Sequence, residues 1–168
     1  MPTLQPVSPD FLDSAPFRIV TDVTVMAPIA HCWTLLADQA SWVQWFSGMS
    51  SVEATPWTWT EPGQKRIVNV NGLKVHETAI SVDHEREYAF MIDKWPLRNA
   101  RRAAEGVRLE DRTNGGAPRT RLTYIGAFES TAIGRKLESI LEKQLGNAWG
   151  TALKELGALA DRKATANA

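Results

Sequence analysis

The alternation of hydrophobic and polar positions predicts a β-rich region followed by one long helix. Between residues 17 and 128, apolar positions recur in short runs that turn residues interrupt, as is typical of antiparallel strands. From Thr131 to Ala160 the apolar period changes to about 3.6 residues and proline is absent, which predicts one helix of roughly 30 residues. We expect strands at residues 17–26, 51–59, 64–70, 73–82, 86–93, 101–113 and 119–128.

Two short helices are expected directly after the first strand. Pro28 suits the first position of a helix, and residues 29–36 carry apolar side chains at helical spacing. Asp38 or Ser41 can cap a second short helix over residues 42–46, which Gly48 ends.

The dipeptide Asn71-Gly72 predicts a tight hairpin, because both residues tolerate the positive φ angles of a two-residue turn. This loop pairs Val68 with Val75 and Arg66 with Glu77. The face that carries these four residues is the more apolar one, so we expect it to be buried, with Arg66 and Glu77 opposite each other inside.

A two-residue His84-Glu85 loop extends the same face. It pairs Ser81 with Tyr88 and Ala79 with Phe90, and both aromatic residues favour burial. Ile80 and Val82 then fall on the outer face, unless a β-bulge moves them.

The glycines of the last hairpin fix a third set of pairs. A Gly115-Gly116 loop places Val107 opposite Tyr124 and Glu105 opposite Gly126, again inside. Gly126 leaves open a bulge that would turn Glu105 outward.

The sheet and the long helix together predict an α+β domain. The helix needs a large apolar surface to lie against, and the sheet is the only candidate, so we expect a curved antiparallel sheet of about seven strands wrapped around the helix with an apolar pocket between them. The polar members of this pocket are Arg66, Glu77 and Glu105. The expected apolar and aromatic lining is Val68, Val70, Val75, Tyr88, Phe90, Ile92, Val107, Leu109, Leu122, Tyr124 and Phe128 from the strands, with Leu141 and Trp149 from the helix.

Three glycines fall close to one line along the long helix. Gly146, Gly150 and Gly157 each cost about 1 kcal/mol relative to alanine in a helix. Close approach to the sheet, room for a ligand and a plain kink all remain open as explanations.

The chain divides into an arm, a domain and a tail. Four prolines in residues 1–16 disfavour both helix and ladder, which predicts an extended N-terminal arm. Residues 17–160 form a single domain, and the small, polar residues 161–168 are expected to fray as a flexible tail.

Composition excludes several classes of protein. The formal net charge is zero, which argues against a broad nucleic-acid-binding surface. No apolar run reaches the roughly 18 residues of a membrane span, and no secretory signal is visible, so we expect a cytoplasmic protein. The single cysteine, Cys32, precludes an internal disulfide, and no histidine has a partner at metal-ligand spacing. We therefore expect no metal and no cofactor.

Five of the seven tryptophans crowd into residues 33–59. They suit either core packing or an aromatic wall around an apolar ligand.

The order of elements resembles the START-related, polyketide cyclase/dehydrase-like (SRPBCC) superfamily, which has the helix-grip fold. The segment DVTVMAPIAHCWTLLADQASWVQWF is similar to the opening of that family, VHETAISVDHEREYAFMI to its middle strands and TRLTYIGAFES to its penultimate strand. The family usually has a proline after the acidic residue of the middle turn, where this chain has His84. The resemblance spans residues 17–160 and implies a cavity for lipids, polyketides or other apolar molecules.

Three functions follow as hypotheses. The first is binding of an apolar small molecule, such as a lipid, an aromatic compound or a polyketide, in the pocket. The second is a polyketide cyclase or dehydratase in which Glu77 acts as general acid or base while Tyr88 or Tyr124 holds a substrate oxygen; an ion pair between Glu77 and Arg66 is the alternative role of that carboxylate. The third is a protein-interaction module without a ligand. An edge strand and the glycine line also make a homodimer plausible.

Overall fold

A seven-stranded antiparallel sheet forms the body of the protein in the computed structural model, which describes residues 1–166. The strands lie in the order β1-β7-β6-β5-β4-β3-β2, so consecutive hairpins lead from β2 to β7 and β1 closes against β7. Their bounds are β1 Phe17–Val25, β2 Met49–Thr55, β3 Lys65–Val70, β4 Leu73–Asp83, β5 Glu87–Lys94, β6 Ala100–Asp111 and β7 Thr120–Ser130.

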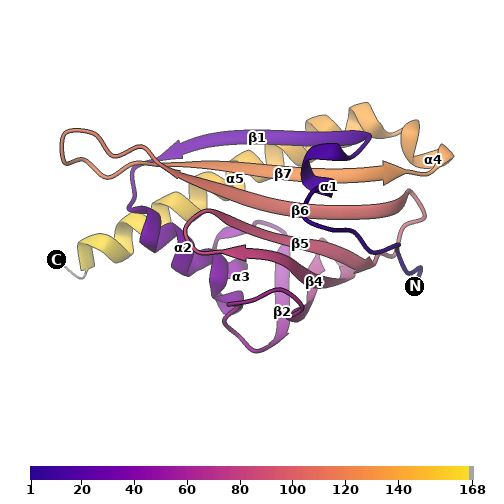
Figure 1. Ribbon diagram of the computed structural model, residues 1–168, viewed down its shortest axis with the longest axis horizontal. Helices are drawn as coiled ribbons and strands as arrows, with labels where there is room; N and C mark the ends of the chain where they lie inside the picture. The colour runs from indigo at the N-terminus through magenta and orange to yellow at the C-terminus, as the bar shows by residue number, and fades with distance from the viewer. Residues whose placement is uncertain (167–168) are drawn as a thin grey trace.

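The long helix lies behind this curved sheet along β1 and β7, as Figure 1 shows. The helices are α1 Phe11–Ser14, α2 Ile29–Ala37, the 3₁₀ turn η1 Gln39–Ser41, α3 Trp42–Trp45, α4 Ala132–Arg135 and α5 Glu138–Ala166. The α+β helix-grip architecture predicted from the sequence is therefore confirmed. None of the helices in residues 1–166 is long and apolar enough to cross a membrane.

The C-terminal helical region differs from the prediction at both ends. The side chain of Thr131 caps α4 by accepting a hydrogen bond from Gly134 N, and tight i→i+3 bonds at Lys136 and Leu137 separate α4 from α5. The single helix predicted from residue 131 is thus two. Helix α5 also runs to Ala166, so residues 161–166, expected to fray, are helical; residues 167–168 of that expected tail lie outside the described residues.

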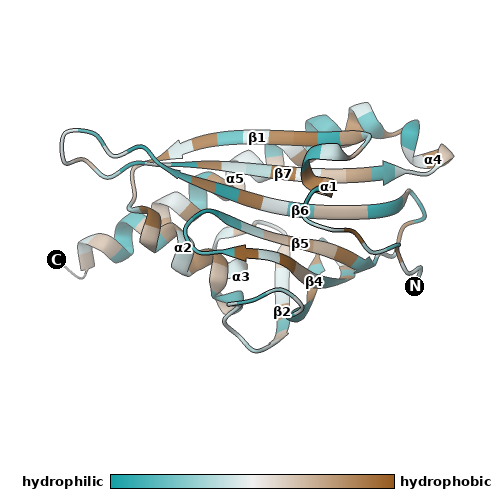
Figure 2. Ribbon diagram, in the orientation of Figure 1, coloured by the Kyte–Doolittle hydropathy of each residue, from teal (hydrophilic) through white to brown (hydrophobic). Residues whose placement is uncertain are grey.

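Two of the three predicted hairpin registers are correct. Arg66 pairs with Glu77 across β3 and β4, and Glu105 pairs with Gly126 across β6 and β7 without a bulge. These registers follow from turns whose glycines adopt positive φ, as Gly72 does at 78°. Figure 2 shows the largely hydrophilic β6–β7 hairpin that projects beyond the sheet.

The β4–β5 register holds only in part. Ala79 pairs with Phe90 as predicted, but a bulge at Ile80 shifts the ladder, so Tyr88 pairs with Val82 and not with Ser81. The extra residue lets Val82 pack on the main core while Ile80 packs on the opposite face of the sheet. The sequence left such a bulge open for Ile80 and Val82, and the structure moves Val82 alone to the inner face.

The N-terminal arm is not simply extended. It contains α1, and Phe11, Leu12 and Ala15 pack as a second apolar cluster on the outer face of the sheet, against Ala89, Ala104, Ile125 and Ala127. Leu4 N donates a 2.8 Å hydrogen bond to Asp93 O, which ties the start of the arm to the end of β5. Four prolines exclude a long helix but not one turn.

Close approach to the sheet explains one glycine of the line along α5, Gly157. A Cβ on Gly157 would lie 2.3 Å from Val25 Cγ1, so β1 can touch the helix only at a glycine. At Gly146 and Gly150 the nearest atoms belong mainly to Thr21, at 3.6 Å and 3.4 Å, which places the same strand alongside without a clash.

Candidate ligand-binding cavity

A cavity in two adjoining parts lies between the inner face of the sheet and α5. The inner part has a volume of about 240 Å³ and the outer part about 100 Å³. Ile92, Trp95, Glu105 and Leu145 border both parts, so the two adjoin at these side chains. This space is large enough for an organic ligand group rather than for water alone.

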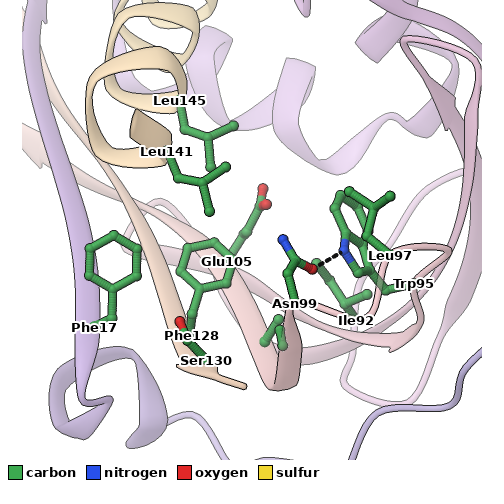
Figure 3. Close-up of a pocket in the computed structure, with 12 residues that line it drawn as sticks. Phe17, Ile92, Trp95, Leu97, Asn99, Glu105, Phe128, Ser130, Leu141 and Leu145 are labelled. Carbon is green, nitrogen blue, oxygen red and sulfur yellow. Dashed lines mark hydrogen bonds between the residues drawn. The ribbon is translucent and has the colours of Figure 1, made fainter. Parts of the chain in front are cut away.

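The outer part is almost wholly apolar. Figure 3 shows Leu141 and Leu145 pointing from α5 into the cavity, near Phe17 and Phe128. Trp95 forms the wall on the other side, and Glu105 lies between the two sides. Asn99 is the other polar side chain of note, and its Oδ1 accepts a 2.8 Å hydrogen bond from Trp95 Nε1. That bond holds the Trp95 ring as a wall of the cavity.

Glu105 and Tyr124 form the polar centre of the cavity. The Tyr124 hydroxyl donates a 2.5 Å hydrogen bond to Oε2 of Glu105. Burial raises the pKa of the Glu105 carboxyl to about 7; the Tyr124 bond lowers it, the charge of Glu77 raises it and that of Arg66 lowers it. Glu105 is only half-buried because it borders the cavity. A carboxyl poised near neutrality therefore faces the space.

Trp149 of α5 fixes the position of Tyr124. The two rings stack at 4.6 Å between centroids with an interplanar angle of 18°. Gly126 makes this possible, because a Cβ there would lie 2.2 Å from Cη2 of Trp149. The glycine opposite Glu105 thus accommodates an aromatic ring and does not mark a bulge.

A buried ion pair closes the inner end of the cavity. Arg66 Nε donates a 2.5 Å bond to Oε2 of Glu77, and its Nη1 donates a 2.8 Å bond to Oε1 of Gln39. The Gln39 amide also bonds the Tyr88 hydroxyl at 2.9 Å and Ala37 O at 2.8 Å. These contacts give Glu77 the ion-pair role that the sequence left as the alternative to catalysis.

Aromatic rings surround the Arg66 guanidinium. Its central carbon lies 4.0 Å from the Trp42 ring centroid, 4.6 Å from that of Phe90 and 5.1 Å from that of Trp59. Burial lowers the pKa of Arg66, but the charge and hydrogen bond of Glu77, together with Tyr88 and Tyr124, more than offset this, so Arg66 stays protonated. For Glu77, burial raises the carboxyl pKa and Arg66 counteracts part of that rise. The tryptophan cluster thus serves the core and also encloses this cation.

The structure brings most of the sequence-predicted site residues to the cavity. The inner part is lined by Arg66, Val70, Val75, Glu77, Phe90, Ile92, Tyr124 and Trp149, and the outer part by Ile92, Phe128 and Leu141. Five residues expected there do not line either part: Val68, Tyr88, Val107, Leu109 and Leu122 are buried in the core. Helices α2 and α3 cover that end of the inner face. Tyr88, for example, packs edge-on against Trp33 of α2 and stacks on Trp59, which follows β2.

Other lining residues were not expected. Phe46 and Met49 come from the end of α3 and the start of β2, while Trp95, Leu97 and Asn99 come from the β5–β6 connection. Trp42 of α3 also lines the inner part, as one of the clustered tryptophans that the sequence offered as an aromatic wall. Trp95 follows directly on a predicted strand, and its aromatic side chain was the available signal. Phe46 and Met49 carried no such signal, because alternation identifies faces only within the sheet.

Neither the cysteine nor the histidines add chemistry to the cavity. Cys32 is buried, and burial raises the pKa of its thiol to about 11, which disfavours the reactive thiolate. Among residues 1–166, no three His, Cys, Asp or Glu side chains gather closely enough to hold a metal ion.

Solved structures share this fold at low sequence identity. The Zhui aromatase/cyclase from Streptomyces sp. R1128 is 19% identical with a TM-score of 0.69, over 88% of this chain and 94% of that chain. The hypothetical protein jhp0584 from Helicobacter pylori is 11% identical with a TM-score of 0.72, over 95% and 97%. The protein XoxI from Bacillus cereus is 15% identical with a TM-score of 0.67, over 85% and 94%.

At these identities the likeness shows the fold alone. No curated protein sequence matches the chain. The family comparison is more specific, because residues 16–161 match the family described as polyketide cyclase/dehydrase and lipid transport. The match covers far more than half of the chain, and it agrees with the resemblance noted in the sequence. The chain belongs to the polyketide cyclase/dehydrase and lipid transport family.

Proposed function

We propose that the protein binds an apolar small molecule that carries a hydrogen-bonding group, in the cavity between the sheet and α5. A lipid, an aromatic compound or a polyketide-like molecule has this character. The observation that supports the proposal most is a largely apolar, two-part cavity with the Glu105–Tyr124 pair at its centre and the Arg66–Glu77 ion pair at its inner end. The aromatic side chains that line the cavity bury the apolar surface of the ligand, and the Glu105–Tyr124 pair orients a hydroxyl or carbonyl group of the ligand.

A cavity-filling variant tests this proposal. Leu145 borders both parts, so Leu145→Trp should fill the junction and reduce uptake of an apolar fluorescent dye roughly tenfold or more. The matched control is Val43→Trp, since Val43 is exposed on α3. Thermal unfolding shows that both variants are folded. Equal dye uptake by wild type and a folded Leu145→Trp variant would contradict ligand binding in the cavity.

Catalysis as a polyketide cyclase or dehydratase is the second candidate. The pKa of Glu105, raised by burial to about 7, suits a general acid or base at neutral pH, and Tyr124 is within reach to hold a substrate oxygen. Glu77 is paired with Arg66, and Tyr88 does not line the cavity, so Glu105 suits the acid-base role better than the residues proposed from sequence. Turnover that falls at least roughly a hundredfold in Glu105→Gln, with dye uptake retained, would favour this function.

The finer expectations drawn from the sequence stay predictions. They are the cytoplasmic location, the homodimer and the absence of a cofactor. If the cavity holds no ligand and takes up no dye, the third hypothesis, a protein-interaction module without a ligand, is favoured.

A further inference from the structure

The neighbouring strands β5 and β6 separate before they reach the end of the sheet. Their ladder ends at the pair Met91 and Ala104, although both strands run on beyond this pair. Ile92 and Ala103, the next residue on each strand, line the outer part of the cavity. The sheet therefore has a split at this point, and the split borders the cavity.

The first residues of the N-terminal arm fill this split. Leu4 N donates a 2.8 Å hydrogen bond to Asp93 O of β5, and Gln5 N donates a 2.9 Å bond to Arg101 O of β6. Because successive N–H groups of an extended chain point to opposite sides, residues 2–5 lie as a short strand between β5 and β6. Figure 1 shows this N-terminal segment, in indigo, running between the ends of the two strands. We name residues 2–5 the arm tip.

The side chain of Leu4 is the part of the arm tip that faces the cavity side of the sheet. It is buried, whereas the side chains of Thr3 and Gln5 are exposed, as alternation along a strand requires. Leu4 belongs to the same apolar cluster as Ile92 and Ala103. The arm tip thus completes the sheet beside the cavity by backbone pairing and by one apolar side chain.

The attachment of the arm tip is short. Trp95 N donates a third backbone bond, of 3.2 Å, to Pro2 O, and both Pro2 and Pro6 lack the N–H that would extend the pairing. The three bonds and one buried leucine have to offset the conformational entropy that the ordered tip loses, which is of similar size. We therefore expect the tip to open locally while the rest of the sheet stays folded.

The remainder of the arm keeps a released tip close to the split. Leu12 of α1 is fully buried, and a Cβ on Gly106 of β6 would lie 2.9 Å from Leu12 Cδ1, so the arm packs closely on the sheet here. Asp13 accepts bonds of 3.0 Å and 2.7 Å from Arg108. Because α1 is anchored in this way, a released tip stays tethered and can return.

We propose that the arm tip is a gate in the sheet through which ligands enter and leave the cavity. When the tip leaves, β5 and β6 lie about 9–10 Å apart, which is twice the ordinary strand spacing and leaves a space one strand wide. An extended hydrocarbon chain is no wider than a peptide strand. The family match covers residues 16–161 and begins after the arm, so the gate lies outside the part of the chain that the family shares. The inference rests on the proposed function, because it concerns passage into the same cavity.

A reversible disulfide between the arm tip and β5 tests the gate. Thr3 and Lys94 form an isolated antiparallel bridge that two of the three backbone bonds flank, and both side chains are exposed. Such a non-hydrogen-bonded pair has Cα atoms about 4.5 Å apart, so Thr3→Cys with Lys94→Cys can form a disulfide, while the native Cys32 is buried. Oxidation of this variant should slow release of the apolar dye Nile red roughly tenfold or more, and reduction should restore the wild-type rate. The amount of dye bound at equilibrium should not change.

Leu4→Ala makes the opposite change. It removes the side chain that fills the split and should speed release of Nile red roughly tenfold. The matched control is Val7→Ala, in the arm but outside the tip, which should release the dye as wild type does. Thermal unfolding shows that both variants are folded.

Hydrogen exchange of wild type supplies a measurement that needs no ligand. The amides of Leu4 and Gln5 should exchange at least roughly tenfold faster than those of the β5–β6 ladder. Exchange of these two amides only at the rate of global unfolding would overturn the gate. Equal release rates in the oxidised and reduced disulfide variant would also overturn it, and would leave ligand binding in the cavity standing. If wild type takes up no dye at all, the proposed function and the gate both fail.

Discussion

The Tyr124 hydroxyl donates a 2.5 Å hydrogen bond to Oε2 of Glu105, across two paired strands and inside a largely apolar cavity. The two residues lie two positions out of register, since Glu105 pairs with Gly126 and Tyr124 with Val107. The side chains meet because Gly126 leaves room for Trp149, whose ring presses on Tyr124. The polar centre of the cavity thus depends on a glycine and a tryptophan that make no polar contact with it.

Stability should fall as Glu105 ionises. Its folded pKa of about 7 lies above the ordinary value of 4.5, so the native state holds this proton more tightly than the unfolded state does. Stability is then greatest below pH 4.5 and decreases as pH rises toward 7, by on the order of 2 kcal/mol for this group. Glu105→Gln should remove that component, as denaturant unfolding at pH 5 and pH 8 would show. The exposed Glu61→Gln serves as control, and an unchanged pH slope in Glu105→Gln would contradict the assignment.

Tyr124→Phe should raise the pKa of Glu105 further. The hydroxyl bond stabilises the ionised carboxylate, so its loss favours the protonated form. The carboxyl carbon chemical shift of Glu105, followed against pH, measures this directly. A titration midpoint that stays in place or moves down would show that the bond does not act on the ionised form.

Removing one partner of the buried Arg66–Glu77 pair should lower the free energy of unfolding much more than replacing both partners with apolar residues. Glu77→Leu leaves Arg66 charged and unpaired among aromatic rings, which we expect to cost about 3–5 kcal/mol of unfolding free energy. Arg66→Met combined with Glu77→Leu removes both charges and should cost much less. Urea unfolding of the two variants compares these values. Equal losses in the single and double variants would mean that the pair does not compensate its own burial.

Substitution by alanine should change stability in opposite directions at two glycines of α5, Gly150 and Gly157. Gly150→Ala meets only an ordinary contact with Thr21 and should be neutral or stabilising by up to about 1 kcal/mol, because alanine favours helix. Gly157→Ala places a methyl group 2.3 Å from Val25 Cγ1 and should destabilise by about 1–3 kcal/mol. Thermal unfolding measures both. The same sign in both variants would argue against close packing of α5 on β1.

The arm should contribute to stability although it is rich in proline. Leu12 is fully buried against the outer face of the sheet, so Leu12→Ala should cost about 2–5 kcal/mol. Val7→Ala, at the half-buried edge of the same cluster, should cost less than about 1 kcal/mol. If Leu12→Ala unfolds like wild type, the arm packs loosely in solution.

The sequence predicted the sheet better than it predicted the cavity. Asn71-Gly72 and Gly115-Gly116 specify their turns locally, so the pairings of Glu77 and Glu105 could be read before the structure. A bulge near Ile80 could be suspected from the sequence, but its exact position could not be read, because it satisfies two apolar clusters on opposite faces that the strand pattern does not reveal.

The sequence did not show which residues of the inner face border the cavity and which are covered by helices. Alternation shows that Tyr88 and Tyr124 point to the same side, but not that α2 and α3 cover the first while space remains beside the second. Glu105 received little weight for the same reason, since the role of Gly126 depends on Trp149, which comes from a helix far along the chain. Residues brought together by packing of separate elements leave no periodic signal.

Mass spectrometry of the freshly purified protein tests the central claim, ligand binding in the cavity, most directly. We predict a reproducible additional mass under native conditions that disappears on denaturation, and that is absent from Leu145→Trp but present in Val43→Trp. Its fragmentation would begin to identify the ligand. A native mass equal to that of the chain alone, together with no uptake of apolar dyes by wild type, would contradict the account.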